Sequence, residues 1–330
     1  MDVLIVGAGL AGLMAAHELR KKGFSILVVD KGRSVGGRLA TRRIGPGQAD
    51  TGAQFFTVRT GAFRARVIDW TERGLVFTWS RGWATPAGPA EPDNHPRYAV
   101  SGGMNALAKD LGRDLPVHVN VKISGVSPVR DGWQVTDTEG RIYACRAALL
   151  TAPVPQSLTL IETGRAPMMA GDLEALRRVE YAPCLAGLYW LDRPAQFPEP
   201  GAMQAISAKV SWAADNHRKG VSGGATVLTV HGSSAYSQER YQARDADVLA
   251  ELLEEVRPWL GDATVQEMQL KRWRYALPAV VHPRQFLLAE GVPPLAFAGD
   301  AFGEPRVEGA AVSGMLAADA VSQLLLKAAR

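Results

Sequence analysis

Three glycines near the N-terminus have the spacing of a backbone turn that can hold a phosphate. Gly7, Gly9 and Gly12 follow the apolar run Val3–Val6 and open a helical pattern. The first glycine permits a tight turn, the second lets a pyrophosphate approach the backbone, and the third lets the helix pack closely on the strand. The start of the helix adds amide donors and the positive end of its dipole. The sequence therefore predicts a site for the pyrophosphate of a dinucleotide.

An acidic residue follows at the position expected for ribose binding. Asp30 ends a second apolar run, Ile26–Val29, and comes eighteen residues after Gly12. A carboxylate at the end of this strand can accept hydrogen bonds from ribose hydroxyls. Two strands joined by a helix form a parallel unit, so the chain is expected to open as a doubly wound sheet. This arrangement serves NAD and FAD alike.

A second glycine segment lies directly after this acid. Gly36 and Gly37 allow the backbone to run against a flat ring or a phosphate, and Arg38 offers a forked donor for a phosphate. Gly32–Gly36 also fits the G-x-S-x-G pattern of a hydrolase nucleophile. We reject that interpretation because the dinucleotide pattern already occupies the first strand–helix–strand unit, and the glycine pair explains the segment.

Other residues that could do chemistry are few. The six histidines have no metal-ligand spacing, so no metal is predicted. His231 ends a predicted strand, and Trp273 and Tyr275 alternate along another, so these two rings face the same side of it while Arg274 faces the other. His231, Trp273 and Tyr275 are candidates for a substrate pocket. Core packing is the alternative for the aromatic pair, and a structural role is the alternative for His231.

The rest of the chain is predicted to supply a second domain. Val117–Thr151 indicates an antiparallel meander, and Asp247–Arg257 is an amphipathic helical pattern. A strand at Leu295–Ala298 precedes a long alanine-rich helix at about Val307–Lys327. We expect one discontinuous domain made of 1–56, 98–155 and 285–330, and a substrate domain made of 57–97 and 156–284.

Composition excludes several classes of protein. The 330 residues are 47% apolar and carry a net charge of +4, without a long basic run, so neither disorder nor nucleic-acid binding is expected. Only Cys145 and Cys184 are present, which excludes a disulfide-rich secreted scaffold and suits a cytoplasmic protein. Val3–Ala16 is interrupted by glycines and preceded by an acid, unlike a signal peptide. No stretch is expected to cross a membrane.

Several segments together resemble the FAD-binding framework of the amine oxidase superfamily. They are the first glycine pattern, Gly36–Arg38, Asp50–Phe56, Ala298–Asp300 and Val307–Ala311. Within that superfamily, Gly52–Phe56 and Lys271–Ala276 look most like the bacterial renalase branch. The resemblance implies an α/β fold of the amine oxidase/p-hydroxybenzoate hydroxylase type, with a Rossmann-type FAD-binding domain and a mixed α+β substrate domain.

The resemblance also implies which residues hold FAD. The N-terminal contacts would be Gly7, Gly9, Leu10, Ala11, Gly12, Asp30, Lys31, Gly36, Gly37 and Arg38. Further along the chain they would be Ala53, Gln54, Phe55, Ile123, Gly299, Asp300, Val307, Gly309 and Ala310. The helix beginning near Glu308 would aim its N-terminus at the flavin, where its dipole stabilises the charge of the reduced ring. FAD is expected to be non-covalent, because neither cysteine lies in a segment predicted to touch the ring.

The function implied by the renalase resemblance is oxidation of misplaced dihydro isomers of NAD(P)H. Hydride would pass from the 2-dihydro or 6-dihydro form to the flavin, and O2 would be reduced to H2O2. The donor ring would lie between the flavin and the middle domain, against Trp273 and Tyr275. An amine or amino acid oxidase and a flavin-bound redox sensor without turnover are the alternatives. The choice between NAD and NADP, and the oligomeric state, stay open.

Overall fold

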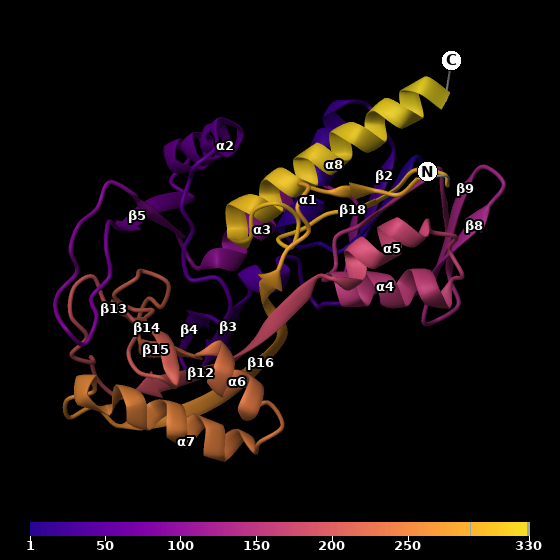
Figure 1. Cartoon of the computed structure of the whole chain (residues 1–330). Coiled ribbons are helices and arrows are strands. Elements are labelled where there is room, and N and C mark those ends of the chain that lie inside the picture. The colour runs from indigo at the N-terminus through magenta and orange to yellow at the C-terminus, as the bar shows by residue number, and fades with distance from the viewer. Residues whose placement is uncertain (291, 329–330) are drawn as a thin grey trace. The chain divides into compact units, whose positions relative to one another are not determined.

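The computed structural model describes residues 1–290 and 292–328, which divide into two compact units (Figure 1). Unit 1 comprises 1–37, 108–180 and the described residues of 278–330, and unit 2 comprises 38–107 and 181–277. Each unit is built from segments far apart in the chain, as the sequence predicts for the first domain. The unit boundaries differ from the predicted domain boundaries at 38–56, 98–107, 156–180 and 278–284. The predicted boundaries followed motifs and proline-rich breaks, whereas the units follow packing.

Unit 1 is built on a six-stranded sheet in the order β17-β18-β11-β1-β2-β7. Its strands are β1 (Val3–Val6), β2 (Ile26–Val29), β7 (Val117–His118), β11 (Ala147–Leu150), β17 (Leu287–Leu288) and β18 (Leu295–Phe297). All neighbours pair in parallel except β17 with β18. The strands β1, β2, β11 and β18 are buried throughout, as continuous apolar runs in a covered parallel sheet should be. The predicted doubly wound sheet is confirmed.

Five helices accompany this sheet along the chain. They are α1 (Leu10–Lys21), α3 (Met104–Gly112, which begins in unit 2), α4 (Val154–Thr163), α5 (Ala170–Arg177) and α8 (Arg306–Ala328). Figure 1 shows α8 lying along α1. Gly314 of α8 approaches α1 so closely that a Cβ atom there would lie 2.1 Å from the Ala11 carbonyl oxygen.

Helix α8 corrects one sequence-based expectation. Its 23 residues are long and apolar enough to cross a membrane, although no such stretch was expected. Half of its most apolar part is buried inside the protein, and its close packing on α1 is that of a core helix. The length and the apolar composition of α8 are therefore explained by its packing against α1.

The predicted antiparallel meander is also present in unit 1. β8 (Ile123–Val129), β9 (Gly132–Asp137) and β10 (Ile142–Cys145) pair in the order β10-β9-β8. Gly132, the first residue of β9 after the turn, has φ +155, and a Cβ atom there would lie 2.1 Å from the carbonyl oxygen of Cys145 at the end of β10. The turn signals in the sequence thus reflect a real steric demand.

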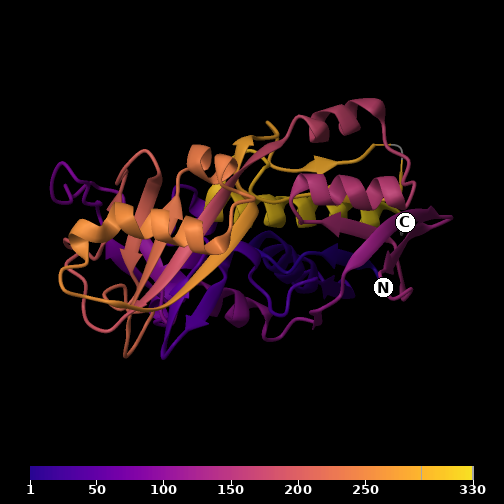
Figure 2. The same cartoon turned by 90° about the horizontal axis from the view of Figure 1, so that it is seen from below.

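Unit 2 is built on a five-stranded sheet in the order β13-β14-β15-β12-β16. Its strands are β12 (Glu180–Leu191, which begins in unit 1), β13 (Ala202–Gln204), β14 (Val210–Asp215), β15 (Thr226–Gly232) and β16 (Val265–Val280, which ends in unit 1). The helices α6 (Ser234–Glu239) and α7 (Asp245–Val256) follow β15, and the 3-10 turn η2 (Arg257–Trp259) follows α7. Figure 2 shows α7 running across these strands.

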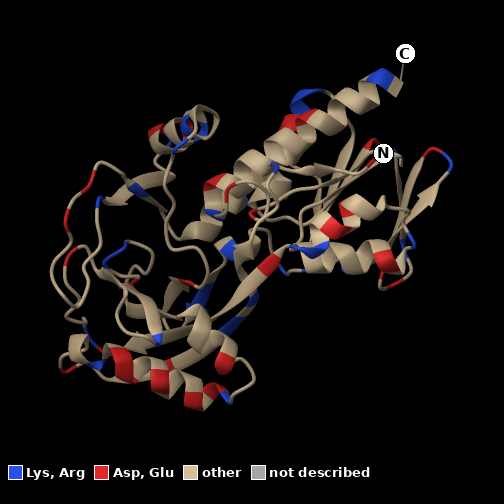
Figure 3. Cartoon of the chain, in the orientation of Figure 1, with Lys and Arg blue, Asp and Glu red and all other residues tan. Residues whose placement is uncertain are grey.

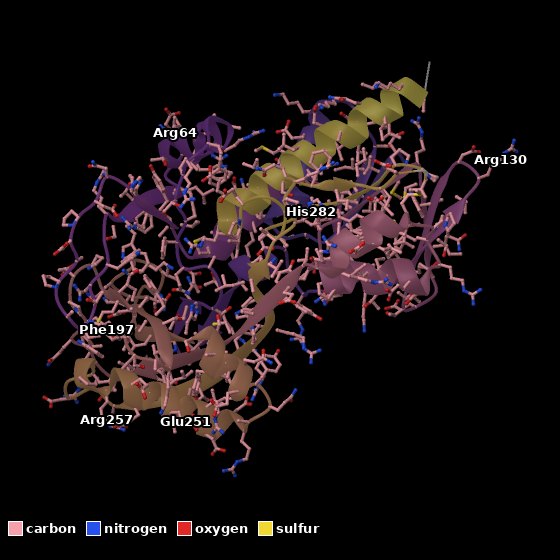
Figure 4. The ribbon with its side chains drawn as sticks, in the orientation of Figure 1. Arg64, Arg130, Phe197, Glu251, Arg257 and His282 are labelled. Atoms are coloured by element: carbon pink, nitrogen blue, oxygen red, sulfur yellow. The ribbon has the colours of Figure 1, made fainter. Side chains whose placement is uncertain are left out.

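Helix α7 confirms the predicted amphipathic pattern. Its apolar residues Val248, Leu249 and Leu252 are buried in one cluster with Leu228 and Val230 of β15. Its acidic residues colour the helix red in Figure 3, and Figure 4 labels Glu251 on it. One face of the five-stranded sheet is therefore covered by α7.

Smaller elements complete unit 2. β3 (Thr41–Ile44) pairs with β4 (Gly47–Asp50), and β5 (Val76–Ser80) pairs with β6 (Arg97–Val100). The helix α2 (Gly61–Glu72), which the sequence analysis did not identify, and the 3-10 turn η1 (Gly37–Leu39) precede these pairs or lie between them. The segment 82–96 contains no helix or named strand, in agreement with the predicted irregular loop.

Candidate flavin site and substrate face

Three strand ends meet where the strand order of unit 1 reverses. β1 is followed on one side by β2 and on the other by β11, so this is the point at which doubly wound sheets bind ligands. Gly7 comes directly after β1 and Thr151 directly after β11, and Gly299 comes two residues after β18. Thr151 Oγ1 donates to the carbonyl oxygens of Val6 and Gly7. Thr151, which sequence reasoning missed, therefore fixes the turn that carries the first glycine.

Two of the three N-terminal glycines have a steric reason to be glycine within the protein itself. Gly7 has φ +116, and a Cβ atom there would lie 2.5 Å from Thr151 Oγ1. A Cβ atom on Gly12 would lie 1.9 Å from the Gly7 carbonyl oxygen, so this glycine allows helix and turn to pack. A Cβ atom on Gly9 would meet nothing within 4 Å. Gly9 is the N-cap of α1, so open space lies in front of the start of this helix.

The predicted ribose acid and the second glycine segment lie beside this turn. Asp30 Oδ2 accepts from the Ala8 amide at 2.7 Å, and Oδ1 accepts from the Gly32 amide at 2.6 Å. The Gly36 amide donates to the Ala8 carbonyl oxygen at 2.8 Å, and Gly37 has φ +53. Backbone and carboxylate thus form one cradle whose residues fit the pyrophosphate and ribose of a dinucleotide.

The other predicted cofactor residues of unit 1 lie in varied surroundings. Lys31 Nζ donates to Gln156 Oε1 at 2.8 Å, while Ile123 opens β8 and is buried. Asp300 is buried after Gly299, and α8 begins at Arg306, close to the predicted start. Val307 is buried and Ala310 is partly buried. Gly309 has a structural reason of its own, because a Cβ atom there would lie 1.6 Å from the Glu304 carbonyl oxygen.

Four predicted cofactor residues belong to unit 2. Arg38 Nη1 donates to the carbonyl oxygens of Tyr275 and Ala276 at 3.2 and 3.3 Å. The Ala53 amide donates to the Arg38 carbonyl oxygen, and Gln54 Nε2 donates to the Asp50 carbonyl oxygen at 2.6 Å. The fourth, Phe55, packs 4.8 Å from the Trp83 ring and 5.4 Å from the Trp212 ring. The guanidinium predicted to face a phosphate is therefore held against β16 in this structure.

Two predicted pocket residues converge on one backbone oxygen. Trp273 Nε1 donates to the Thr51 carbonyl oxygen at 2.8 Å, and His231 Nε2 lies 3.2 Å from the same oxygen. Trp212 is the cross-strand neighbour of His231, so the two side chains share one face of the sheet. We name Trp212, His231 and Trp273 the substrate face, after the substrate pocket that the sequence predicts at His231 and Trp273, which stays a prediction.

Trp273 and Arg274 face opposite sides of β16, as the predicted alternation requires. Arg272 donates to the Tyr241 carbonyl oxygen and Arg274 lies over the Tyr241 ring, whereas Trp273 contacts Thr51. Tyr275 packs edge-on against Tyr181, with ring centroids 5.5 Å apart. A role for Trp273 and Tyr275 as walls of a donor pocket stays a prediction.

The sequence did not reveal a buried ion pair next to Thr51, the residue whose carbonyl oxygen His231 and Trp273 contact. Lys219 Nζ lies 2.6 Å from Asp50 Oδ2, and both side chains are fully buried. Asp50 Oδ1 also accepts from Thr41 Oγ1 at 2.5 Å and from the Met104 amide at 2.8 Å. Burial lowers the pKa of Lys219, and Asp50 opposes that effect. Because Asp50 precedes Thr51, the pair anchors the carbonyl group that holds His231 and Trp273.

The substrate face holds His231 in its neutral form. Burial, opposed by the Thr51 hydrogen bond and reinforced by the Lys219 charge, lowers the pKa of His231 to about 4. Cys184, in the same sheet, has its thiol pKa raised by burial to about 12, so it is not a thiolate near neutral pH. Within residues 1–290 and 292–328, no group of three or more His, Cys, Asp or Glu side chains could hold a metal ion.

We expect His231 to make the folded protein less stable in mild acid. Its pKa is about 4 when folded, below the ordinary value of 6.5, so the unfolded chain binds the proton more readily. The stability contributed by neutral His231 is complete above about pH 6.5 and decreases as the pH falls toward 4, by roughly 3 kcal/mol in all. Urea unfolding of wild type and His231→Gln between pH 4.5 and 7.5 tests this. The stability difference between the two should change with pH, and parallel curves would contradict the prediction.

The fold and the glycine turn together define a dinucleotide-binding protein of the Rossmann type. Residues 5–66 match the family described as NAD(P)-binding Rossmann-like domain. Residues 71–322 match the family described as flavin containing amine oxidoreductase, which covers most of the chain. The chain therefore belongs to the flavin-containing amine oxidoreductases, and its expected cofactor is FAD.

Individual relatives match shorter segments of the chain. One is the Mycobacterium tuberculosis protein named "Putative flavin-containing monoamine oxidase AofH", which is 47% identical over 78 residues. That alignment covers 24% of this chain and 16% of the relative. A flavin-containing monooxygenase of Arabidopsis thaliana, FMO GS-OX-like 3, is 27% identical over 148 residues, which are 42% of this chain and 32% of the relative.

Solved structures share the complete fold at low sequence identity. One is described as a putative protoporphyrinogen oxidase from Exiguobacterium sp. 255-15, with a TM-score of 0.74 and 12% identity over 98% of both chains. Wild-type putrescine oxidase bound to putrescine gives a TM-score of 0.69 and 16% identity over 97% of this chain and 99% of the other. These likenesses establish the fold of the amine oxidase type.

Proposed function

We propose that the protein is a flavin oxidase of the renalase type, which oxidises 2-dihydro and 6-dihydro isomers of NAD(P)H to NAD(P)+ and reduces O2 to H2O2. The supporting observation is the substrate face, with two indoles and an imidazole held neutral near physiological pH. Flat rings of this kind can orient a dihydronicotinamide ring. Bound FAD would supply the hydride acceptor and the reaction with O2.

The surroundings of the substrate face support a reaction without a protein acid or base. Lys219, the nearby cation, is paired with Asp50, and His231 has its pKa lowered to about 4. Hydride transfer depends chiefly on the distance and orientation of the donor, which rigid side chains can provide. Trp273 and His231 are both anchored on the Thr51 carbonyl oxygen, so their positions are fixed relative to each other.

The choice of hydride donor tests the proposal. We expect 6-dihydroNAD to bleach the flavin without oxygen at least 100-fold faster than ordinary NADH or a monoamine, roughly a 3 kcal/mol difference in barrier, because each isomer presents its hydride from a different ring position. Stopped-flow absorbance measures the rates, and admission of air should restore the yellow colour with formation of peroxide. Faster bleaching by an amine would replace this proposal with the amine oxidase alternative, which family membership favours. Failure of every donor would favour a sensor.

We also propose that FAD is held without a covalent bond. Cys145 Sγ lies 3.8 Å from the Trp133 carbonyl oxygen in the antiparallel sheet, and burial raises its pKa to about 11. Acid precipitation of the purified protein should therefore release intact FAD into the supernatant, where chromatography identifies it. Yellow colour that stays with the precipitated chain would contradict the proposal.

A further inference from the structure

The hydrogen bond of His231 determines which of its ring nitrogens is free. The Thr51 carbonyl oxygen can only accept, so Nε2 of His231 carries the proton that is donated to it over 3.2 Å. In a neutral imidazole the other nitrogen, Nδ1, then has a free lone pair. Among the described residues, Nδ1 has no hydrogen-bond partner. It is also absent from the fully buried polar atoms that lack a partner, so a ligand can reach it.

The neighbours of His231 keep this lone pair available. Trp273 donates to the same Thr51 oxygen, and Asp50 and Lys219 anchor the preceding residue, so the acceptor that fixes the tautomer cannot easily move. Trp212 and Ala186, the cross-strand neighbours of His231, carry no charge. A neutral acceptor next to indole rings is suited to an N–H group on a flat ring rather than to an anion.

We infer that His231 Nδ1 accepts a hydrogen bond from the carboxamide N–H of the dihydronicotinamide donor and is a specificity-determining residue. The inference rests on the proposed function and deepens it, because it names the ring substituent that the site recognises. A donor whose ring carries an acetyl group offers a carbonyl oxygen but no N–H, so it leaves Nδ1 without a partner. Such a loss weakens binding because a polar group becomes buried without a hydrogen bond.

Two substitutions test the roles of the two ring nitrogens of His231 separately. In His231→Asn the amide oxygen can replace Nδ1 as an acceptor, whereas in His231→Gln the longer amide can replace Nε2 as the donor to Thr51 and leaves no acceptor at Nδ1. Calorimetry on FAD-loaded protein would measure the binding of NAD+, of its thionicotinamide analogue, which keeps the N–H group, and of its acetylpyridine analogue, which lacks it. We expect wild type and His231→Asn to bind the first two about tenfold more tightly than the third.

We expect His231→Gln to bind all three dinucleotides with affinities within about twofold of one another. Equal affinities in the wild type, absence of binding, or selectivity retained in His231→Gln would overturn the inference. Because the readout is binding, it does not depend on turnover. If no dihydro isomer bleaches the flavin but the His231-dependent selectivity is found, the proposed function fails while the recognition of a carboxamide stands.

Discussion

A Gly9→Leu protein is expected to fold normally and to bind FAD roughly 100-fold or more weakly, equivalent to about 3 kcal/mol. Folding should be normal because a Cβ atom on Gly9 would meet no protein atom within 4 Å, and the Gly9 backbone, with φ −75, suits any residue. The space in front of Gly9 is the space that a pyrophosphate needs to reach the amides at the start of α1. Fluorescence titration of the apoprotein with FAD measures the affinity, and urea unfolding of the apoprotein measures the fold.

Two other glycines provide the controls for this prediction. A Cβ atom on Gly61, at the start of α2, would also meet no atom within 4 Å, so Gly61→Leu should change neither folding nor flavin affinity. Gly12→Ala should destabilise the apoprotein itself, because its Cβ atom would lie 1.9 Å from the Gly7 carbonyl oxygen. Normal flavin content in Gly9→Leu would show that the pyrophosphate does not approach this turn.

Lys219→Met is expected to reduce the free energy of unfolding by about 3–5 kcal/mol. The substitution leaves Asp50 fully buried with its charge uncompensated, although Thr41 and the Met104 amide still donate to it. The double variant Lys219→Met/Asp50→Asn should recover at least half of the loss, because it removes the unpaired charge and keeps an acceptor for those donors. Urea unfolding of the single and double variants gives both numbers.

A surface pair provides the matched comparison. Arg244 lies 2.8 Å from Asp247 but its side chain is 84% exposed, so Arg244→Met should cost no more than about 1 kcal/mol. If Lys219→Met costs as little as Arg244→Met, the buried pair does not anchor the Thr51 segment. A double variant as unstable as the single one would show that Lys219 acts through packing on the Trp79 ring, 5.0 Å away, rather than through its charge.

The fold class and most of the dinucleotide cradle could be predicted from the sequence. Gly7, Gly9, Gly12 and Asp30 lie within one strand–helix–strand unit, and local backbone geometry fixes the distances within such a unit. The amphipathic α7 was predictable for the same reason, because its pattern repeats within a few turns. The helix α2 was not, since only three of its residues, Phe63, Val67 and Trp70, are buried.

The construction of the substrate face, in contrast, depends on contacts between distant parts of the chain. Lys219 and Asp50 are 169 residues apart and look like ordinary surface charges in the sequence, yet folding buries them as a pair. Thr51 has no chemistry of its own, and it matters because its carbonyl oxygen receives His231 and Trp273 from two other strands. Periodicity reports which side of an element a residue faces, but it carries no information about which distant residue will meet it there. That pairing is set by the register of the sheet and by the need to satisfy buried polar groups, which depend on the whole fold.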